Sequence, residues 1–491
     1  MFATEDNATE SPVAPVPPRY RWLKRLLTLG VLLLLGLLLL RWWWGWEAHR
    51  QLQAEIDRIV ARGEPIFPED FDPPEEIPDD QNAALAFIKA AEALTVTAEQ
   101  DDLIENADSL EELTPQEFQL LADLEAKNAE TLRLVRQTRN MPGADWGTRF
   151  RDAAINVDLM MPSLAPQRQL CRVLGAIAIY QHHTGNDEQA IEMFRDVLHG
   201  AEVMDQMPTL VSHLGALAIG EVGVSHIERV AHDLTIGDSP AAARDAVESL
   251  IAELLDEQSL SEGLRTAMQV ERMWQLDVVL GIVENKLGFI SNVSPGGTGQ
   301  TSLTEQVLIF PIKPLFEMDG VVMIRHMNQI IQACEQPNWP AADRIIKPLE
   351  QEWEASPGTL GKIKHPVSNW MLPSLGRTVL FQHDGLARRR MAAIALAIRL
   401  YEIDHGRRPA ELAELVPDYL DEVPRDPMAP DGATIRYRPQ AEVPVLYSVG
   451  RNGIDDGGLV WDEKGKKYDR HNRRDLVFLL DGVLPGVREG D

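Results

Sequence analysis

Cysteine is scarce in this sequence, which limits the cross-links and metal sites that the chain can form. Its only two cysteines, Cys171 and Cys334, lie 163 residues apart. The chain therefore has neither a CxxC metal-binding pair nor a disulfide framework. An oxidising compartment would allow one disulfide between them. Two buried free thiols fit the same residues, because free cysteine packs as a small apolar side chain.

Basic residues are also in deficit. The chain has 47 Lys and Arg against 76 Asp and Glu, which gives a formal net charge of −29. A surface this acidic repels phosphates, and no Lys/Arg stripe offsets it, so nucleic acid is excluded as a partner. The acidic residues are spread along the chain, as is typical of a solvated surface.

Sequence signatures of catalysis are missing as well. The chain contains no HExxH, GxSxG or GxxxxGK[ST] motif. The adjacent His182 and His183 point to different faces of a helix, and His383–Asp384 lacks the further His and Asp that a phosphohydrolase needs. An extracytoplasmic hydrolase would therefore need a site assembled from distant residues of the helical part. The first candidates for such a site are His182, Glu221, His226 and Glu228.

One long apolar run is present near the N-terminus. The uncharged stretch Leu26–Leu40 has fifteen residues. As a helix it rises about 22 Å, which is short of the roughly 30 Å hydrocarbon core of a bilayer. Flanking side chains that suit a membrane interface supply the remainder. These are Lys24, Arg25 and Arg41, which can snorkel, and the aromatic belt of Trp42, Trp43, Trp44 and Trp46. The sequence predicts a transmembrane helix over residues 22–46.

The residues around this run favour an uncleaved anchor. A cleaved signal peptide would need small residues after the run, where this chain has Arg and Trp. The basic residues crowd its N-terminal side, at Arg19, Arg21, Lys24 and Arg25. By the positive-inside rule the N-terminus lies in the cytoplasm and about 445 residues lie outside it. In a bacterium this is the inner (cytoplasmic) membrane, with the bulk of the chain in the periplasm.

Composition and helical periodicity divide the chain into seven segments. We expect a disordered cytoplasmic tail (1–21), the transmembrane helix (22–46), a stalk with an acidic, Pro-rich segment (47–80), a helical domain (81–290), a flexible linker (291–302), a helical or irregular segment (303–385) and a C-terminal domain (386–491).

Residues 170–198 resemble one tetratricopeptide-type helical hairpin. The residues that carry the likeness are Ile177, Ala178, Gly185, Ala190 and Phe194. A repeat array needs about three copies, and no second clear copy follows at the expected period of about 34 residues. An ordinary helical hairpin explains the same pattern.

The C-terminal hundred residues combine a helix with short strands. The helix is expected from about Leu386 to His405, and Gly406 is a good stop for it. Residues 434–438, 444–449, 459–461 and 475–480 read as strands. The expected fold is mainly α, as a helical bundle or repeat-like array. It has one N-terminal transmembrane helix and a small C-terminal α+β domain, in which a long helix packs on an antiparallel sheet.

The loop "YSVGRNGIDDGG" (447–458) concentrates oxygen-bearing side chains between two of these strands. Asn452, Asp455 and Asp456 supply side-chain oxygens, and four glycines allow the positive φ angles that turn carbonyl groups inward. Ca²⁺ binds six to eight such oxygens. A phosphate cradle is disfavoured by the two carboxylates. A hairpin turn with solvated Asp and Gly explains the same residues.

The C-terminal layout resembles the globular part of the major pseudopilin of type II secretion systems. The likeness rests on "RRPAELAELV", "PRDPMAPDGATIRYRP", "VPVLYSVGRNGIDDGG" and a later Asp with apolar residues. The resemblance implies a Ca²⁺-stabilised loop whose ligands would be Asn452, Asp455, Asp456 and Asp475. Asn452 stands where the family usually has Asp, and Asp475 lies farther along than expected. The whole chain resembles large uncharacterised bacterial envelope proteins that carry the same tail.

Pilin function itself is not expected. No Gly-Phe-Thr-Leu-x-Glu-like processing site precedes the membrane helix, which lies about 345 residues upstream of the C-terminal helix. The sequence therefore favours a single-pass envelope protein that binds or scaffolds protein partners over an enzyme. The alternatives are the hydrolase described above and an accessory component of a secretion or pilus-like apparatus.

Overall fold

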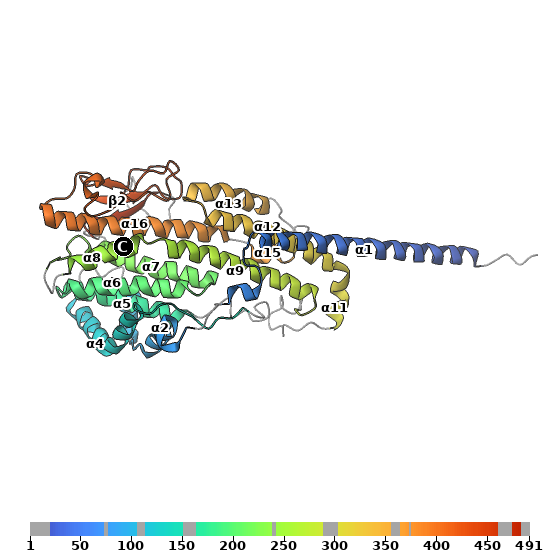
Figure 1. Cartoon of the computed structure of the whole chain (residues 1–491), viewed down its shortest axis with the longest axis horizontal. Helices are drawn as coiled ribbons and strands as arrows, with labels where there is room; N and C mark the ends of the chain where they lie inside the picture. Colours follow the sequence, from blue (N-terminus) through green and yellow to red (C-terminus); the bar gives the residue numbers. More distant parts are fainter. Residues whose placement is uncertain are drawn as a thin grey trace, which may run out of the picture.

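The computed structural model describes residues 20–72, 77–105, 113–150, 164–237, 242–287, 303–354, 364–372, 375–459 and 474–482. These residues form a mainly helical structure with one small antiparallel sheet, as the sequence predicts. Figure 1 shows an elongated body from which one long helix, α1, projects. The predicted tail (1–21), apart from its last two residues, and the whole predicted linker (291–302) lie outside the described residues.

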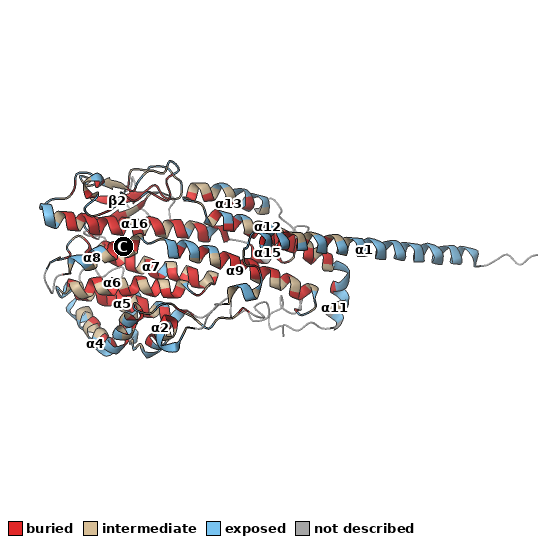
Figure 2. Ribbon diagram, viewed as in Figure 1, coloured by how far each residue is buried: buried red, intermediate tan, exposed pale blue. Residues whose placement is uncertain are grey.

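Helix α1 is a single unbroken helix of 41 residues, Arg21–Ala61. Its first half is exposed and apolar, with no residue of the most apolar window buried, so it is a candidate membrane span. A second apolar helix, α7 (Leu210–Val230), also passes the test of length and composition. More than half of the α7 window is buried inside the body, as expected for a core helix. Figure 2 shows this contrast between exposed α1 and buried α7.

The second half of α1 packs into the body. Leu52, Ile56 and Ile59 recur at helical spacing and are buried against α9 (Gln258–Val283) and α12 (Lys313–Cys334). Gly320 of α12 allows this close approach, because a Cβ there would lie 3.4 Å from Leu52 and 3.1 Å from Val279. The segment predicted as a stalk is therefore part of the core along one face. Its sequence reads as polar because the other faces of the helix remain solvated.

A buried arginine fastens the end of α1. The side chain of Arg272 in α9 is 1% exposed, and its Nη1 donates to Glu64 at 2.8 Å and to Asn328 at 2.6 Å. Its Nη2 donates to the carbonyl oxygen of Pro65 at 2.9 Å. One guanidinium thus joins the chain after α1 to α9 and α12.

The rest of the body is built in helical layers (Figures 1 and 2). From one side to the other they are α2 with α4, then α5 with α6, then α7 with α8, then α16. The bounds are α2 Ala83–Ala93, α3 Ala98–Glu105, α4 Pro115–Thr138, α5 Ala165–His183, α6 Asp187–Asp205, α8 Arg244–Leu255, α11 Leu303–Ile309, η5 Phe310–Ile312, α13 Trp339–Glu354, α15 Ser368–Met371 and α16 Leu375–His405. Helices α5 and α6 form the helical hairpin predicted over 170–198, and Gly185 takes φ +77° at its turn.

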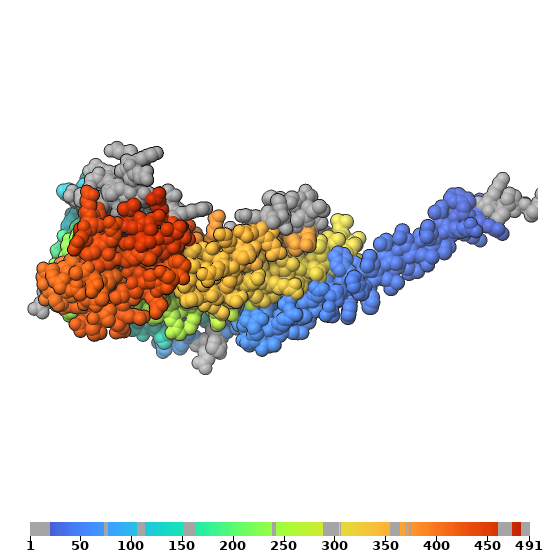
Figure 3. Space-filling model, turned by 90° about the horizontal axis from the view of Figure 1, so that it is seen from above, coloured from blue at the N-terminus to red at the C-terminus, as the bar shows by residue number. Residues whose placement is uncertain are grey.

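Three short strands cover the outer face of α16. They are β1 Arg436–Arg438, β2 Val445–Ser448 and β3 Leu476–Leu479, in the order β1-β2-β3 with antiparallel pairing throughout. They confirm three of the four predicted strands. Of the fourth, 459–461, only Leu459 is described, and it is not in a strand. Figure 3 shows the sheet and α16 together at one end of the body and α1 at the other.

Helix α16 begins eleven residues earlier than the sequence predicts, at Leu375 instead of Leu386. Gly385 makes this part of the helix look like a break, but a Cβ there would meet only Leu217, at 3.7 Å. The helix stops at Gly406, whose φ is +67°, as predicted. Cys171 and Cys334 are free thiols.

Arg272→Ala should lower the free energy of unfolding by about 3 kcal/mol, because it removes one partner of a buried ion pair and strands the acceptors around it. Urea unfolding in detergent micelles, followed by circular dichroism, measures the change. Arg62→Ala is the matched control: Arg62 pairs with the same Glu64, but its side chain is about half exposed. That control should cost less than about 1 kcal/mol. Equal losses in the two variants would contradict the role given to Arg272.

Candidate functional site

The loop residues 449–458, which follow β2, require glycine at two positions. Gly450 and Gly458 have φ angles of +61° and +60°. A Cβ on Gly450 would lie 2.2 Å from the carbonyl oxygen of Arg474, and one on Gly458 would lie 2.5 Å from the ring of Tyr447. Only glycine satisfies both the backbone angle and the space at these positions. The positive φ angles predicted from the sequence are confirmed.

The structure brings the four predicted ligand residues into this loop. Asp475 accepts hydrogen bonds from the backbone N–H groups of Asp456 at 3.2 Å and Gly458 at 2.7 Å. Asn452 Nδ2 donates to Asp456 at 2.9 Å. Burial raises the pKa of Asp475, and the negative charges of Asp456 and Asp455 add to that effect against the two backbone donors.

A cation already present in the chain pairs with the loop. Arg436 of β1 lies between two carboxylates: its Nε is 3.0 Å from Asp455 and its Nη1 is 3.2 Å from Asp426. The other oxygen of Asp455 accepts from the N–H of Gly457 at 2.9 Å. Arg438, two residues later, donates to the carbonyl oxygen of Gly457. Two arginines of one strand therefore bind one of the four predicted ligands, Asp455, and one backbone carbonyl of the loop.

These contacts bear on the calcium expectation. Within the ranges described, no group of three or more His, Cys, Asp or Glu side chains is arranged to hold a metal ion. Asp455 faces Arg436, while Asp475 and Asn452 accept hydrogen bonds from backbone N–H groups of the loop itself. In this conformation these oxygens are paired with donors of the chain itself. Calcium stays a prediction.

Asp426 organises the sheet from beneath this loop, and sequence reasoning did not single it out. It is 1% exposed. Its carboxylate accepts from Ser448 Oγ at 2.7 Å and from the N–H groups of Met428 and Val449, both at 2.9 Å. With Arg436 this makes four donors on one buried carboxylate. The sequence signal was present as the "RDP" turn before β1, but nothing local indicated the Ser and Arg partners.

The loop is also tied to the long helix. Arg451 Nη2 lies 2.8 Å from Asp384 of α16, and its guanidinium stands over the ring of Phe381. Burial raises the pKa of Asp384, against the effect of the Arg451 charge. His383 donates from Nδ1 to the carbonyl oxygen of Val379 at 2.8 Å, within the same helix. Asp384 of the His-Asp dipeptide therefore joins α16 to the loop, while His383 binds within its own helix. Among the described residues, neither side chain is shown beside the further His and Asp that a phosphohydrolase site needs.

The hydrolase candidates are engaged separately. His182 lies at the end of α5, where its two ring nitrogens are 2.6 Å from Asp187 and 3.2 Å from Asp233. Burial opposes protonation of the ring, but these two carboxylates outweigh it and raise the pKa of His182 to about 9. The pair fastens the α5–α6 turn to the chain that follows α7.

The other three candidates lie on α7 and serve packing. Glu221 pairs with Arg388 of α16 at 3.3 Å. His226 donates from Nδ1 to Val222 O at 2.6 Å, and its ring fills the space that Gly175 leaves. Glu228 accepts the N–H of Leu479 at 2.7 Å, which satisfies a donor of the edge strand β3. These partners of Glu221, His226 and Glu228 are different residues, and none of these contacts brings the three side chains together.

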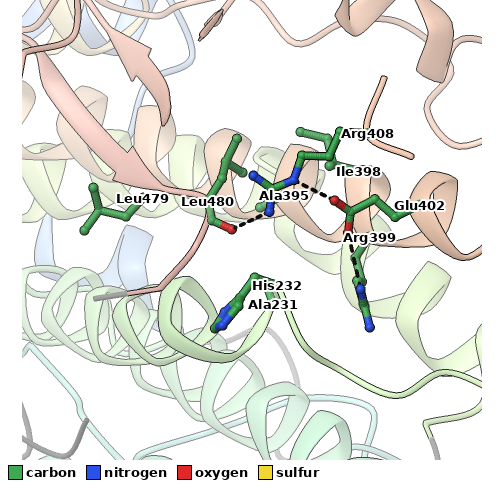
Figure 4. A pocket seen from close by; sticks show the side chains of 9 residues that line it. All are labelled: Ala231, His232, Ala395, Ile398, Arg399, Glu402, Arg408, Leu479 and Leu480. Carbon is green, nitrogen blue, oxygen red and sulfur yellow. Dashed lines mark hydrogen bonds and ion pairs between the residues drawn. The ribbon is translucent and has the colours of Figure 1, made fainter. Parts of the chain in front are cut away.

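Two cavities lie among the described residues near the elements discussed above. One, between α7, α16 and β3, has a volume of about 10 Å³, room for one water molecule (Figure 4). Arg408 crosses it, binding Glu402 at 2.6 Å and the carbonyl oxygen of Leu480 at 3.3 Å. The other is an open depression of about 350 Å³ beside Asp101 and Gln169, where α2, α3 and α5 meet. Neither cavity is lined by a hydrolase candidate.

No protein-family model matches this chain, and no curated protein or solved structure shows significant similarity to it.

Asp426→Asn should lower the free energy of unfolding by about 2–4 kcal/mol, because Asn turns an NH₂ group towards donors that now share a carboxylate. Hydrogen exchange of the Val449 amide should quicken in parallel. The control is Asp431→Asn, an exposed residue of the same turn. Its change should stay within about 0.5 kcal/mol. Unchanged exchange at Val449 would count against the arrangement.

His182→Gln should change the pH dependence of stability. The folded-state pKa of about 9 lies above the unfolded value of 6.5, so the stabilisation is complete below pH 6.5 and is lost as the pH rises through 9. The difference in unfolding free energy between wild type and variant should shrink by roughly 1–3 kcal/mol from pH 6 to pH 10.

His183→Gln is the control for this titration. Burial, followed by the charge of His182, lowers the pKa of His183, so that ring is neutral from pH 7 upward. Its difference from wild type should be flat between pH 7 and pH 10. A parallel decline in both variants would show that the effect does not belong to the His182 ion pairs.

Proposed function

We propose that this chain is a single-pass protein of the bacterial inner membrane whose body, outside the cytoplasm, binds or scaffolds other proteins. The observation that carries the proposal is helix α1. Its first half is exposed and apolar, and its second half is buried in the body. A signal peptide that is removed has no reason to continue as a core helix, so this continuity supports an anchor that is kept.

The charges around α1 support the orientation. Arg21, Lys24 and Arg25 lie on the N-terminal side of the apolar run, whereas Arg50 on the other side is paired with Glu47 at 2.6 Å. Positive charge that favours the cytoplasm is therefore concentrated before the run. The body would then be periplasmic.

The build of the body supports a binding role more than a catalytic one. The titratable residues singled out as hydrolase candidates each join two elements, as described above, and none of them lines either cavity. Helix α16, the "RDP" turn and the β1–β2–β3 sheet follow one another in the order that the resemblance to a pseudopilin globular domain implies for residues 386–491. A place beside a secretion or pilus-like apparatus rests on that resemblance alone.

The membrane orientation can be tested with single cysteines. A membrane-impermeant maleimide should label Ile454→Cys, an exposed position of the body, on intact spheroplasts. It should label Ser11→Cys only after permeabilisation. The native thiols will not compete, because burial raises the pKa of Cys171 and raises that of Cys334 to about 12. The reverse labelling pattern would place the body in the cytoplasm.

The binding role predicts a complex of fixed ratio. Full-length protein extracted from its native membrane in mild detergent should carry one or more other proteins at constant stoichiometry. A fluorescent protein fused to residues 1–46 controls for binding to the membrane helix. If full-length protein is always recovered alone, or if the fusion recovers the same proteins, then the body has no scaffolding role.

We propose further that Ca²⁺, where it binds, competes with Arg436 for the loop carboxylates. Arg436→Gln leaves Asp426 and Asp455 without their cation, so 10 mM Ca²⁺ should stabilise this variant more than wild type. The gain would be about 2.7 kcal/mol if the ion is present at 100 times its dissociation constant. Thermal melts with Ca²⁺ and with chelator measure it. The double variant Asp455→Ala/Asp456→Ala is the control. Melting temperatures that Ca²⁺ does not change in wild type, in Arg436→Gln or in the double variant would contradict Ca²⁺ binding by this loop.

A further inference from the structure

The segment Leu303–Ile312, formed by α11 and η5, exposes apolar side chains that the body does not cover. Val307 is 73% exposed, Leu308 60%, Phe310 59% and Ile312 42%. Burial of such side chains is worth about 25 cal/mol per Å². A cluster of them on one short segment marks an interaction surface better than scattered single residues do.

This segment lies where α1 leaves the body. Arg41 Nη2 donates to the carbonyl oxygen of Phe310 at 2.7 Å, and its guanidinium stands 5.2 Å from the centre of the Phe310 ring. A Cβ on Gly45 would lie 3.7 Å from Pro314. Figures 1 and 3 both show α11 beside α1 at the end of the body from which that helix projects.

The length of α1 sets the level of this contact relative to a membrane. The uncharged apolar run of α1 rises about 22 Å from Leu26 to Leu40, and Lys24 and Arg25 bound it at the opposite interface. The extracytoplasmic interface then falls at Arg41, which is the residue that holds Phe310. The exposed Trp42, Trp43 and Trp46 lie at the same level and are typical of that interface.

We propose that Leu303–Ile312 is a second membrane contact, which lies in the interfacial layer of the extracytoplasmic leaflet and docks the body on the bilayer that α1 spans. The proposal rests on the proposed span. Phe310 lies against Arg41, the first residue after the apolar run of α1, so lipids that surround this run would also reach the exposed side chains of Val307, Leu308 and Phe310. Lys313, which donates to the carbonyl oxygen of Val283 at 2.5 Å, ends the segment with a cation on the side of the body. Apolar side chains bounded by basic ones are the pattern of interfacial segments.

Depth measurements by electron paramagnetic resonance test the docking on the full chain. Nitroxide is attached to single cysteines at Leu35, Leu308 and Ile454 in vesicles of phosphatidylethanolamine and phosphatidylglycerol. Oxygen relaxes labels in lipid, and a water-soluble nickel chelate relaxes labels in water. Leu35 reports the span, Leu308 the proposed contact and Ile454, which is 62% exposed at the far end of the body, the solvent reference.

Docking predicts an oxygen-to-nickel accessibility ratio at Leu308 several-fold above that at Ile454 and below that at Leu35. A ratio at Leu308 equal to that at Ile454, with Leu35 in lipid, would overturn the docking and leave the span intact. Low accessibility to both reagents at Leu308 would show a protein partner on the segment, which also overturns the proposal. Nickel access at Leu35 would remove the span and the docking together.

A second variant separates docking from any local effect of the label. Val307→Asp/Leu308→Asp places two carboxylates on the exposed face without touching a buried side chain. A nitroxide at Ile312 should then lose its lipid signature and approach the Ile454 ratio. The corresponding double change at two exposed positions after β2, Ile454→Asp/Leu459→Asp, should leave the oxygen-to-nickel accessibility ratio at Ile312 unchanged. An Ile312 ratio that both double variants leave unaltered would refute the docking.

Discussion

The structure depends on one helix whose two halves have different surroundings. Before Arg41 the side chains of α1 are exposed on every face and mostly apolar, which suits the membrane span proposed for this half. After Glu47 only the face that carries Ala48, Leu52 and Ile59 is apolar, because only that face meets α9 and α12. Helix α1 continues without a break from its exposed half into the half that packs against α9 and α12.

Buried and half-buried arginines join separate elements in a chain with a large excess of acid. Arg272 fastens the end of α1, and Arg436 joins Asp426 to Asp455. Arg389 of α16, 5% exposed, donates to the carbonyl oxygens of Glu253 at 2.6 Å and Leu254 at 3.1 Å. These carbonyls belong to the last turn of α8, so Arg389 satisfies acceptors that the helix leaves open.

Sequence patterns predicted the parts of this fold that local chemistry determines. Hydropathy located the candidate span, strand alternation located β1, β2 and β3, and glycine content predicted the positive φ angles at Gly450 and Gly458. The patterns failed where distant residues decide. Nothing near Asp426 in the sequence points to Arg436 and Ser448 as its partners, and nothing near Asp384 points to Arg451, 67 positions away. The metal set Asn452, Asp455, Asp456 and Asp475 stays a prediction, and the cation that the structure places beside Asp455 is Arg436. Arginine has no spacing rule comparable to that of metal ligands.

The position of the loop along the body limits what it can do. Helix α16 has 31 residues and is about 46 Å long, and the sheet covers the end of it that lies farthest from α1 in Figure 1. The loop therefore lies at the end of the body away from α1, where its contacts with Asp384 and Arg436 hold it against α16 and β1. If α1 spans a membrane as proposed, this end of the body is the one farthest from the bilayer. The carboxylates of the loop pair with groups of the chain itself: Asp455 with Arg436, and Asp475 with the backbone N–H groups of Asp456 and Gly458. These contacts hold the shape of the loop without requiring a bound ion.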